Sequence, residues 1–119
     1  MGRVMVIGAS PNPERYSYHC VRALIRKKYS VVALGSRKGN IGNLEIVTDM
    51  IYHQDIDKVI LYVNRDKQQK YLDYVRELRP SEIVFNPGAE CPEMALMAVE
   101  NNIEIHYDCA LVLINTNRL

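Results

Sequence analysis

The stretch Val4-Met5-Val6-Ile7-Gly8-Ala9-Ser10-Pro11-Asn12-Pro13 decides the fold class of this chain. Four apolar residues that end at a glycine are typical of a buried strand, and the small, turn-forming residues after them are typical of a loop. A helix is then expected from Tyr16. In doubly wound α/β proteins this arrangement binds phosphate, because the loop backbone can approach an anion and the helix start presents unpaired N–H groups. The stretch therefore predicts a phosphate site.

The length of 119 residues indicates a single domain that spans residues 1–119. Apolar residues make up 48% of the chain and charged residues 24%, which is ordinary for a globular protein. Fifteen basic and fourteen acidic residues nearly cancel, so nucleic acid is not an expected partner. No apolar run approaches the roughly 20 residues of a membrane span. The three cysteines are odd in number and lack CxxC spacing, which favours a reducing, cytoplasmic location.

Apolar runs and helical patterns alternate along the chain. The runs predict strands at Val4–Ile7, Ser30–Leu34, Leu44–Val47, Lys58–Val63, Glu82–Phe85 and Ile103–His106, with Leu44–Val47 as a short edge strand. Helices are predicted from Tyr16 to about Lys28, after a cap at Asn64, over Pro92–Glu100 and, as a short segment, over Cys109–Ile114. Strand–helix–strand alternation at this spacing predicts a doubly wound, mostly parallel sheet.

A ligand crevice is expected at the carboxyl ends of these strands, where the strand order reverses. The first loop lacks the G-x-G-x-x-G pattern of dinucleotide sites, since it has only Gly8. The second strand is followed by Arg37 and Lys38 instead of the acidic residue that binds a bare ribose. Plain NAD is therefore disfavoured. NADP, with its 2′-phosphate, and coenzyme A (CoA), with its 3′-phosphate, both stay open.

Four motifs together carry a resemblance to a known family: Ile7–Ser17, Gly35–Gly39, Leu61–Asn64 and Phe85–Glu90. The chain resembles the small bacterial and archaeal CoA-binding proteins, which are stand-alone versions of a Rossmann-like domain. That domain also occurs in the α subunit of succinyl-CoA synthetase and in ADP-forming acyl-CoA synthetases. The resemblance covers about residues 3–116, so it includes nearly the whole chain.

This resemblance implies a binding site for CoA or an acyl-CoA. The first loop would hold the diphosphate and close over the ligand, and the loop after the second strand would take the 3′-phosphate and the adenosine end. The other two motifs would line the middle of the groove and flank it. The implied ligand-binding residues are Gly8, Ala9, Ser10, Arg15, Tyr16, Ser17, Ser36, Arg37, Lys38, Val63, Asn64, Asn86, Pro87 and Gly88.

No catalytic activity and no metal are expected. The related synthetases pass a phosphoryl group through a histidine in a separate domain, and neither His19, His53 nor His106 lies in a matching motif. The aspartates between residues 49 and 57 have the spacing of no standard metal site.

Two alternatives stay open: an NADP-dependent oxidoreductase, and a subunit-like interaction protein with a vestigial nucleotide site. Two protein partners stay open: further copies of this chain in a homo-oligomer, and a CoA-using enzyme.

Overall fold

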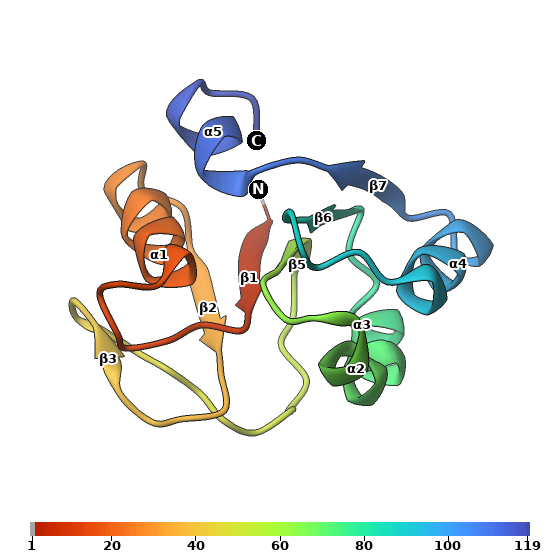
Figure 1. The fold of residues 1–119 in the computed structure, drawn as a ribbon, viewed down its shortest axis with the longest axis horizontal. Helices are drawn as coiled ribbons and strands as arrows, with labels where there is room; N and C mark the ends of the chain where they lie inside the picture. Colours follow the sequence, from red (N-terminus) through yellow and green to blue (C-terminus); the bar gives the residue numbers. More distant parts are fainter. Residues whose placement is uncertain (1) are drawn as a thin grey trace.

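The computed structural model describes residues 2–119 and has the predicted alternation of strands and helices (Figure 1). In chain order the elements are β1 (Arg3–Ile7), α1 (Tyr16–Arg26), β2 (Val31–Leu34), β3 (Asn40–Ile41), β4 (Leu44–Glu45), β5 (Ile56–Leu61), α2 (Arg65–Gln68), the 3₁₀ turn η1 (Gln69–Tyr71), α3 (Leu72–Leu78), β6 (Glu82–Phe85), α4 (Pro92–Glu100), β7 (Glu104–Tyr107) and α5 (Ala110–Asn115).

The main sheet has five strands in the order β2-β1-β5-β6-β7, and every neighbouring pair is parallel. The chain runs from β1 outward to β2 and then returns past β1 to β5. The strand order therefore reverses between β1 and β5, and this is the switch point at which doubly wound sheets bind ligands. The predicted fold class is confirmed.

Helices cover both faces of the sheet. On one face, α1 and α5 pack on residues such as Val6 and Ile60. On the other, α3 and α4 pack on residues such as Ile7, Val59 and Phe85. The alternation along each strand sends successive side chains to opposite faces, and in β1 and β2 and at the ends of β5 and β6 both sets are buried. Within residues 2–119, no helix has the length and apolar character needed to cross a bilayer.

Two local expectations were wrong. Leu44–Val47 is not an edge strand of the main sheet: β4 pairs antiparallel with β3 in a separate two-stranded sheet, and only Val47 makes a bridge, to Leu34. The cause is the tight turn at Gly42, whose φ of +60° closes a short hairpin. The first helix ends at Arg26, close to its predicted end and just before the left-handed Lys28. The helix after Asn64 is broken into α2, η1 and α3.

Candidate functional site

A crevice of about 620 Å³ opens at the carboxyl ends of the strands, beside the switch point between β1 and β5. This volume is typical of small-molecule sites. Of the residues implied by the sequence, those that line the crevice are Gly8, Ala9, Ser10, Arg15, Tyr16, Ser17, Ser36, Arg37, Val63, Asn64, Pro87 and Gly88. Lys38 and Asn86 do not line it. All four predicted segments therefore meet at one edge of the sheet.

The first loop passes very close to the end of β5. Gly8 has a φ of +96°, and a Cβ atom there would lie 3.0 Å from Cγ1 of Val63. The N–H groups of Gly8 and Ala9 both donate to the carbonyl of Leu34, at 2.9 and 3.0 Å, so these amides fasten the loop to β2. An anion must therefore be held by other donors than these two.

The start of α1 supplies such donors. No side chain caps this helix, and Tyr16 and Ser17 at its first turn line the crevice. Their N–H groups, like that of Ser10, have no hydrogen-bond partner among residues 2–119. The free N–H groups and the positive end of the helix dipole together favour an anion. The free N–H donors thus lie a few residues beyond Gly8, the glycine on which the sequence-based prediction rests.

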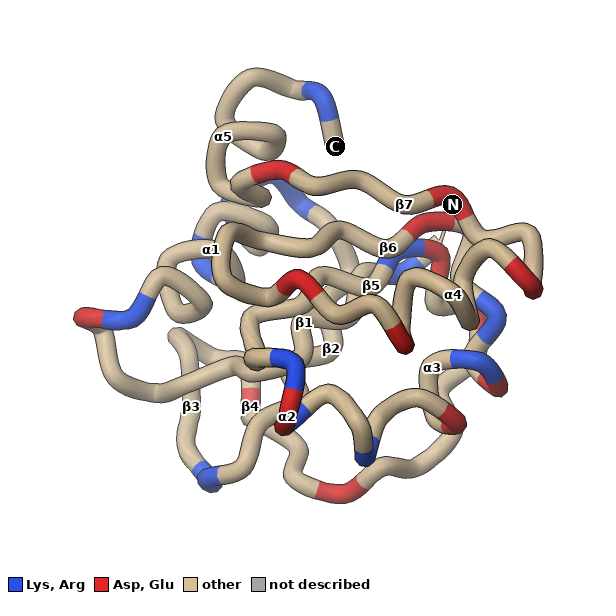
Figure 2. The backbone as a smooth tube through the Cα atoms, turned by 45° about the vertical axis from the view of Figure 1, so that its right-hand side comes forward, with Lys and Arg blue, Asp and Glu red and all other residues tan. Residues whose placement is uncertain are grey.

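Four cationic side chains line the crevice: Arg15, Arg37, Lys67 and Lys70. None of the described residues that line it is an aspartate or glutamate. The basic positions of α2 appear in blue in Figure 2. This arrangement attracts a ligand that carries several negative charges, because charge-assisted hydrogen bonds are the strong ones. Lys38, by contrast, lies outside the lining, so only Arg37 of the predicted basic pair faces the crevice.

Sequence reasoning missed Lys67 and Lys70. The signal that could have found Lys67 is the cap at Asn64, which was recognised: the side-chain oxygen of Asn64 accepts the N–H of Lys67 at 3.0 Å. A cap fixes the start of a helix, and the third residue after it lies in the first turn, beside the same strand end. The break at η1 then brings Lys70 to the crevice, and no sequence pattern marked that break.

Two buried amide side chains hold the loops of the crevice in place. Asn86 donates from Nδ2 to the carbonyl of Leu61 at 2.9 Å and accepts the N–H of Ala110 at 2.8 Å. Gln68 is completely buried and donates from Nε2 to the carbonyls of Val63 and Ala89, at 2.8 and 2.5 Å. Asn86 therefore ties the end of β5 and the start of α5 to the end of β6 instead of facing the crevice, which corrects its predicted position. Gln68 was not predicted at all.

Replacing Gln68 by methionine is expected to lower the free energy of unfolding by about 1–2 kcal/mol. The substitution keeps the volume but leaves two carbonyl groups without their donor. Part of that cost is offset because Oε1 of Gln68, which is buried without a partner, is also removed. Urea unfolding measures the change. Substitution of the exposed Gln54 by methionine is the control and should leave the urea midpoint unaltered. Equal midpoints for the two variants would show that the hydrogen bonds of Gln68 do not stabilise the fold.

An ion pair braces α2 against α4. Arg65 donates to the carboxylate of Glu93 at 3.0 and 2.5 Å, and Gln69 donates to the same carboxylate at 3.2 Å. These bonds, led by that from Arg65, lower the pKa of Glu93 to about 2. The ion pair therefore connects α2, which carries Lys67, to α4, which follows the loop that contains Pro87 and Gly88.

This ion pair makes the free energy of unfolding depend on pH. A carboxylate with a lowered pKa adds stability above its unfolded pKa of about 4.3, and this is lost as the pH falls toward 2. Glu93→Gln is therefore expected to lose less stability than the parent between pH 5 and pH 3, by a small amount because the pair is exposed. Urea midpoints at the two pH values test this. If the urea midpoints of the two proteins fall by the same amount between pH 5 and pH 3, the Arg65–Glu93 pair contributes nothing to the pH dependence of stability.

Fold and site together define a doubly wound α/β domain with a crevice lined by cationic side chains at its switch point. The sequence profile of a CoA-binding domain family matches residues 2–115. The chain belongs to this CoA-binding domain family. No curated protein matches the sequence significantly.

Solved structures have the same fold. A crystal structure of an uncharacterized protein is 28% identical, with a TM-score of 0.95, and the match covers 100% of this chain and 98% of the other. A protein from Thermus thermophilus is 18% identical with a TM-score of 0.83, over 99% and 91% of the two chains. A hypothetical protein from Pyrococcus horikoshii OT3 is 17% identical with a TM-score of 0.84, over 97% and 82%. The last two likenesses concern the fold alone.

Proposed function

We propose that the crevice between β1 and β5 binds CoA or an acyl-CoA and that the protein performs no catalysis of its own. The observation that carries this proposal is the set of four cations, with no carboxylate among the described lining residues, in a chain that belongs to a CoA-binding family. CoA carries a diphosphate and a separate 3′-phosphate, so it needs cations at more than one place. The free amides at the start of α1 suit one of these groups.

The position of Arg37 supports a phosphorylated ribose as the group near β2. Arg37 follows β2 in the loop where a dinucleotide-binding domain has its ribose-binding acid. Lys67 and Lys70 lie on the opposite side of the switch point, after β5, and suit the diphosphate. Val63, after β5, and Pro87, after β6, also line the crevice and offer apolar surface for the pantetheine arm.

The chemistry of the lining supports binding without catalysis. No histidine, cysteine, aspartate or glutamate is among the described residues that line the crevice. Cys20 on α1 is completely buried, and burial raises the pKa of its thiol to about 12. A thiol with that pKa stays protonated and is a poor nucleophile at neutral pH. The three free cysteines fit the cytoplasmic location that we propose.

Isothermal titration calorimetry tests the proposal. CoA is expected to bind one site per chain, and 3′-dephospho-CoA to bind about tenfold more weakly, because it loses one charge-assisted contact. NADPH is the control for the oxidoreductase alternative. No heat with CoA at millimolar concentration, from a folded sample, would refute CoA binding; tighter binding of NADPH than of CoA would favour the alternative. Light scattering with and without CoA tests the subunit-like alternative, which predicts assembly that does not depend on CoA.

A further inference from the structure

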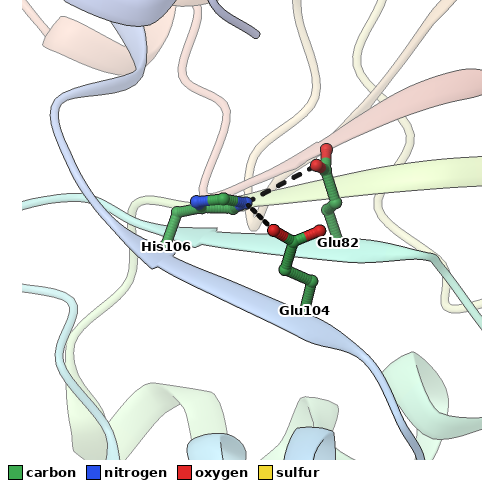
Figure 3. Close-up of side chains that lie close together, drawn as sticks. All are labelled: Glu82, Glu104 and His106. Carbon is green, nitrogen blue, oxygen red and sulfur yellow. Dashed lines mark ion pairs between the residues drawn. The ribbon is translucent and has the colours of Figure 1, made fainter.

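Three potential metal ligands meet on the sheet, far from the crevice. Glu82 begins β6, and Glu104 and His106 lie on β7 (Figure 3). Glu82 pairs directly with Glu104 across the two strands, and His106 is two residues further along the same strand face. The pairing of β6 with β7 therefore brings together donors that are more than 20 residues apart in the sequence. The crevice lies at the carboxyl ends of the strands, whereas Glu82 and Glu104 lie at the opposite ends.

The donor atoms have the spacing of a metal centre. Nε2 of His106 lies 3.5 Å from Oε1 of Glu82 and 3.4 Å from Oε1 of Glu104. In a tetrahedral zinc site with bonds of about 2.0–2.1 Å, neighbouring donor atoms are about 3.3–3.4 Å apart. All three donors lie within 4.8 Å of one another. A small divalent cation could therefore contact all three after only slight movement.

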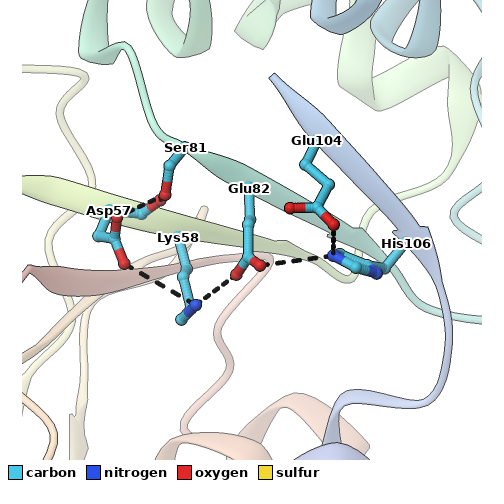
Figure 4. Close-up of polar contacts among 6 residues, drawn as sticks. All are labelled: Asp57, Lys58, Ser81, Glu82, Glu104 and His106. Atoms are coloured by element: carbon cyan, nitrogen blue, oxygen red, sulfur yellow. Dashed lines mark hydrogen bonds and ion pairs between the residues drawn. The ribbon is translucent and has the colours of Figure 1, made fainter. Parts of the chain in front are cut away.

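Neighbouring groups hold Glu82 in position. Lys58 on β5 pairs with Oε2 of Glu82, which leaves Oε1 turned toward His106 (Figure 4). Lys58 is also 3.8 Å from Asp57, and Ser81 donates to Asp57 at 2.5 Å. Support of this kind around a ligating carboxylate orients it and keeps its free oxygen available.

The charge of the cluster also suits a divalent cation. Asp57, Glu82 and Glu104 contribute three negative charges and Lys58 one positive charge, so the group carries a net charge of −2 when the imidazole is neutral. Glu82 is 23% exposed, His106 34% and Glu104 64%, so water and ions reach the donors from one side. Three protein ligands with an open side leave room for a water molecule as the fourth ligand.

We propose that Glu82, Glu104 and His106 form a binding site for a divalent transition-metal ion such as Zn²⁺. Imidazole and carboxylate donors are the set that zinc accepts, whereas Mg²⁺ and Ca²⁺ need more oxygen ligands than the cluster has. The ion accepts the lone pair of Nε2 in the neutral imidazole, and the single ring proton then lies on Nδ1. The site is independent of the CoA crevice. It also departs from the sequence-based expectation of no metal, because only the strand pairing reveals it.

Calorimetric titration of the untagged, metal-free protein with Zn²⁺ tests the proposal, in the absence of CoA so that the two proposals fail separately. One equivalent is expected to bind with micromolar or lower Kd, and Mg²⁺ is expected not to bind. Both His106→Ala and Glu104→Gln should weaken Zn²⁺ binding at least tenfold. Glu104→Gln changes only an exposed side chain, so it tests the site even where His106→Ala perturbs folding.

His19→Ala is the matched control, because His19 is an exposed histidine on α1, outside the cluster, and its loss should leave the Kd unchanged. A second readout is the melting temperature, which Zn²⁺ should raise in the parent protein and in His19→Ala but not in Glu104→Gln. Absence of binding at millimolar Zn²⁺ would overturn the proposal. So would binding that persists unchanged in both cluster variants, because the metal would then sit elsewhere.

Discussion

Replacing Arg37 and Lys67 together by alanine is expected to weaken CoA binding by about a hundredfold. Each side chain lines the crevice, and they approach it from opposite sides of the switch point, after β2 and after β5. A hydrogen bond to a charged group contributes about 1.5 kcal/mol, so two independent contacts account for about 3 kcal/mol, or about two orders of magnitude in Kd. Calorimetric titration of the double variant with CoA measures the loss.

The control for this variant removes the same charge from other places. Lys38→Ala combined with Arg26→Ala also deletes two positive charges, but Lys38 lies outside both cavities and Arg26 lines a second cavity of about 570 Å³ between α1 and the β3–β4 hairpin. The control should bind CoA within about threefold of the parent, since long-range attraction alone is weak in salt. Equal losses in the two double variants would mean that net charge, and not the crevice, determines affinity.

Replacing Gly35 by alanine is expected to lower the free energy of unfolding by roughly 2–4 kcal/mol, the range of severe overpacking. A Cβ atom on Gly35 would lie 2.2 Å from the carbonyl oxygen of Ala9, which belongs to the backbone and cannot rotate away. The first loop and the end of β2 would have to separate. Because both segments line the crevice, CoA binding should weaken as well.

Gly88→Ala provides the comparison for stability. Gly88 has a φ of +92°, but a Cβ atom there would meet nothing within 4 Å, so the substitution costs only the backbone strain of about 1 kcal/mol. Urea unfolding of the two variants distinguishes the steric clash expected for Gly35→Ala from the backbone strain expected for Gly88→Ala. A loss for Gly35→Ala no larger than that for Gly88→Ala would contradict the close approach of the two segments.

The sequence was sufficient for the parts of the molecule that depend on local patterns. The apolar run before Gly8 predicted the buried first strand, and Asn64 and Pro92 predicted the starts of two helices. The convergence of four loops at one sheet edge followed from the parallel order of the strands.

Features that depend on contacts between distant segments were not predictable. Gln68 looked like any polar residue of a helix, and only the packing of α2 against the loop after β6 buries it. The amides of Gly8 and Ala9 were expected to face a phosphate, but Leu34 of the neighbouring strand accepts both. Glu82 and His106 became neighbours only through the pairing of β6 with β7. A single sequence carries no local signal for such contacts.

The central claim is that the crevice beside Gly8, and no other surface, holds the CoA ligand. Amide chemical shifts of the ¹⁵N-labelled protein, followed while CoA is added, test this most directly. Saturable shifts are expected to concentrate at Ser10, Tyr16, Ser17 and Gly88, which all line the crevice. Shifts confined to the second cavity, around Arg22, Arg26 and Gly42, would contradict the claim.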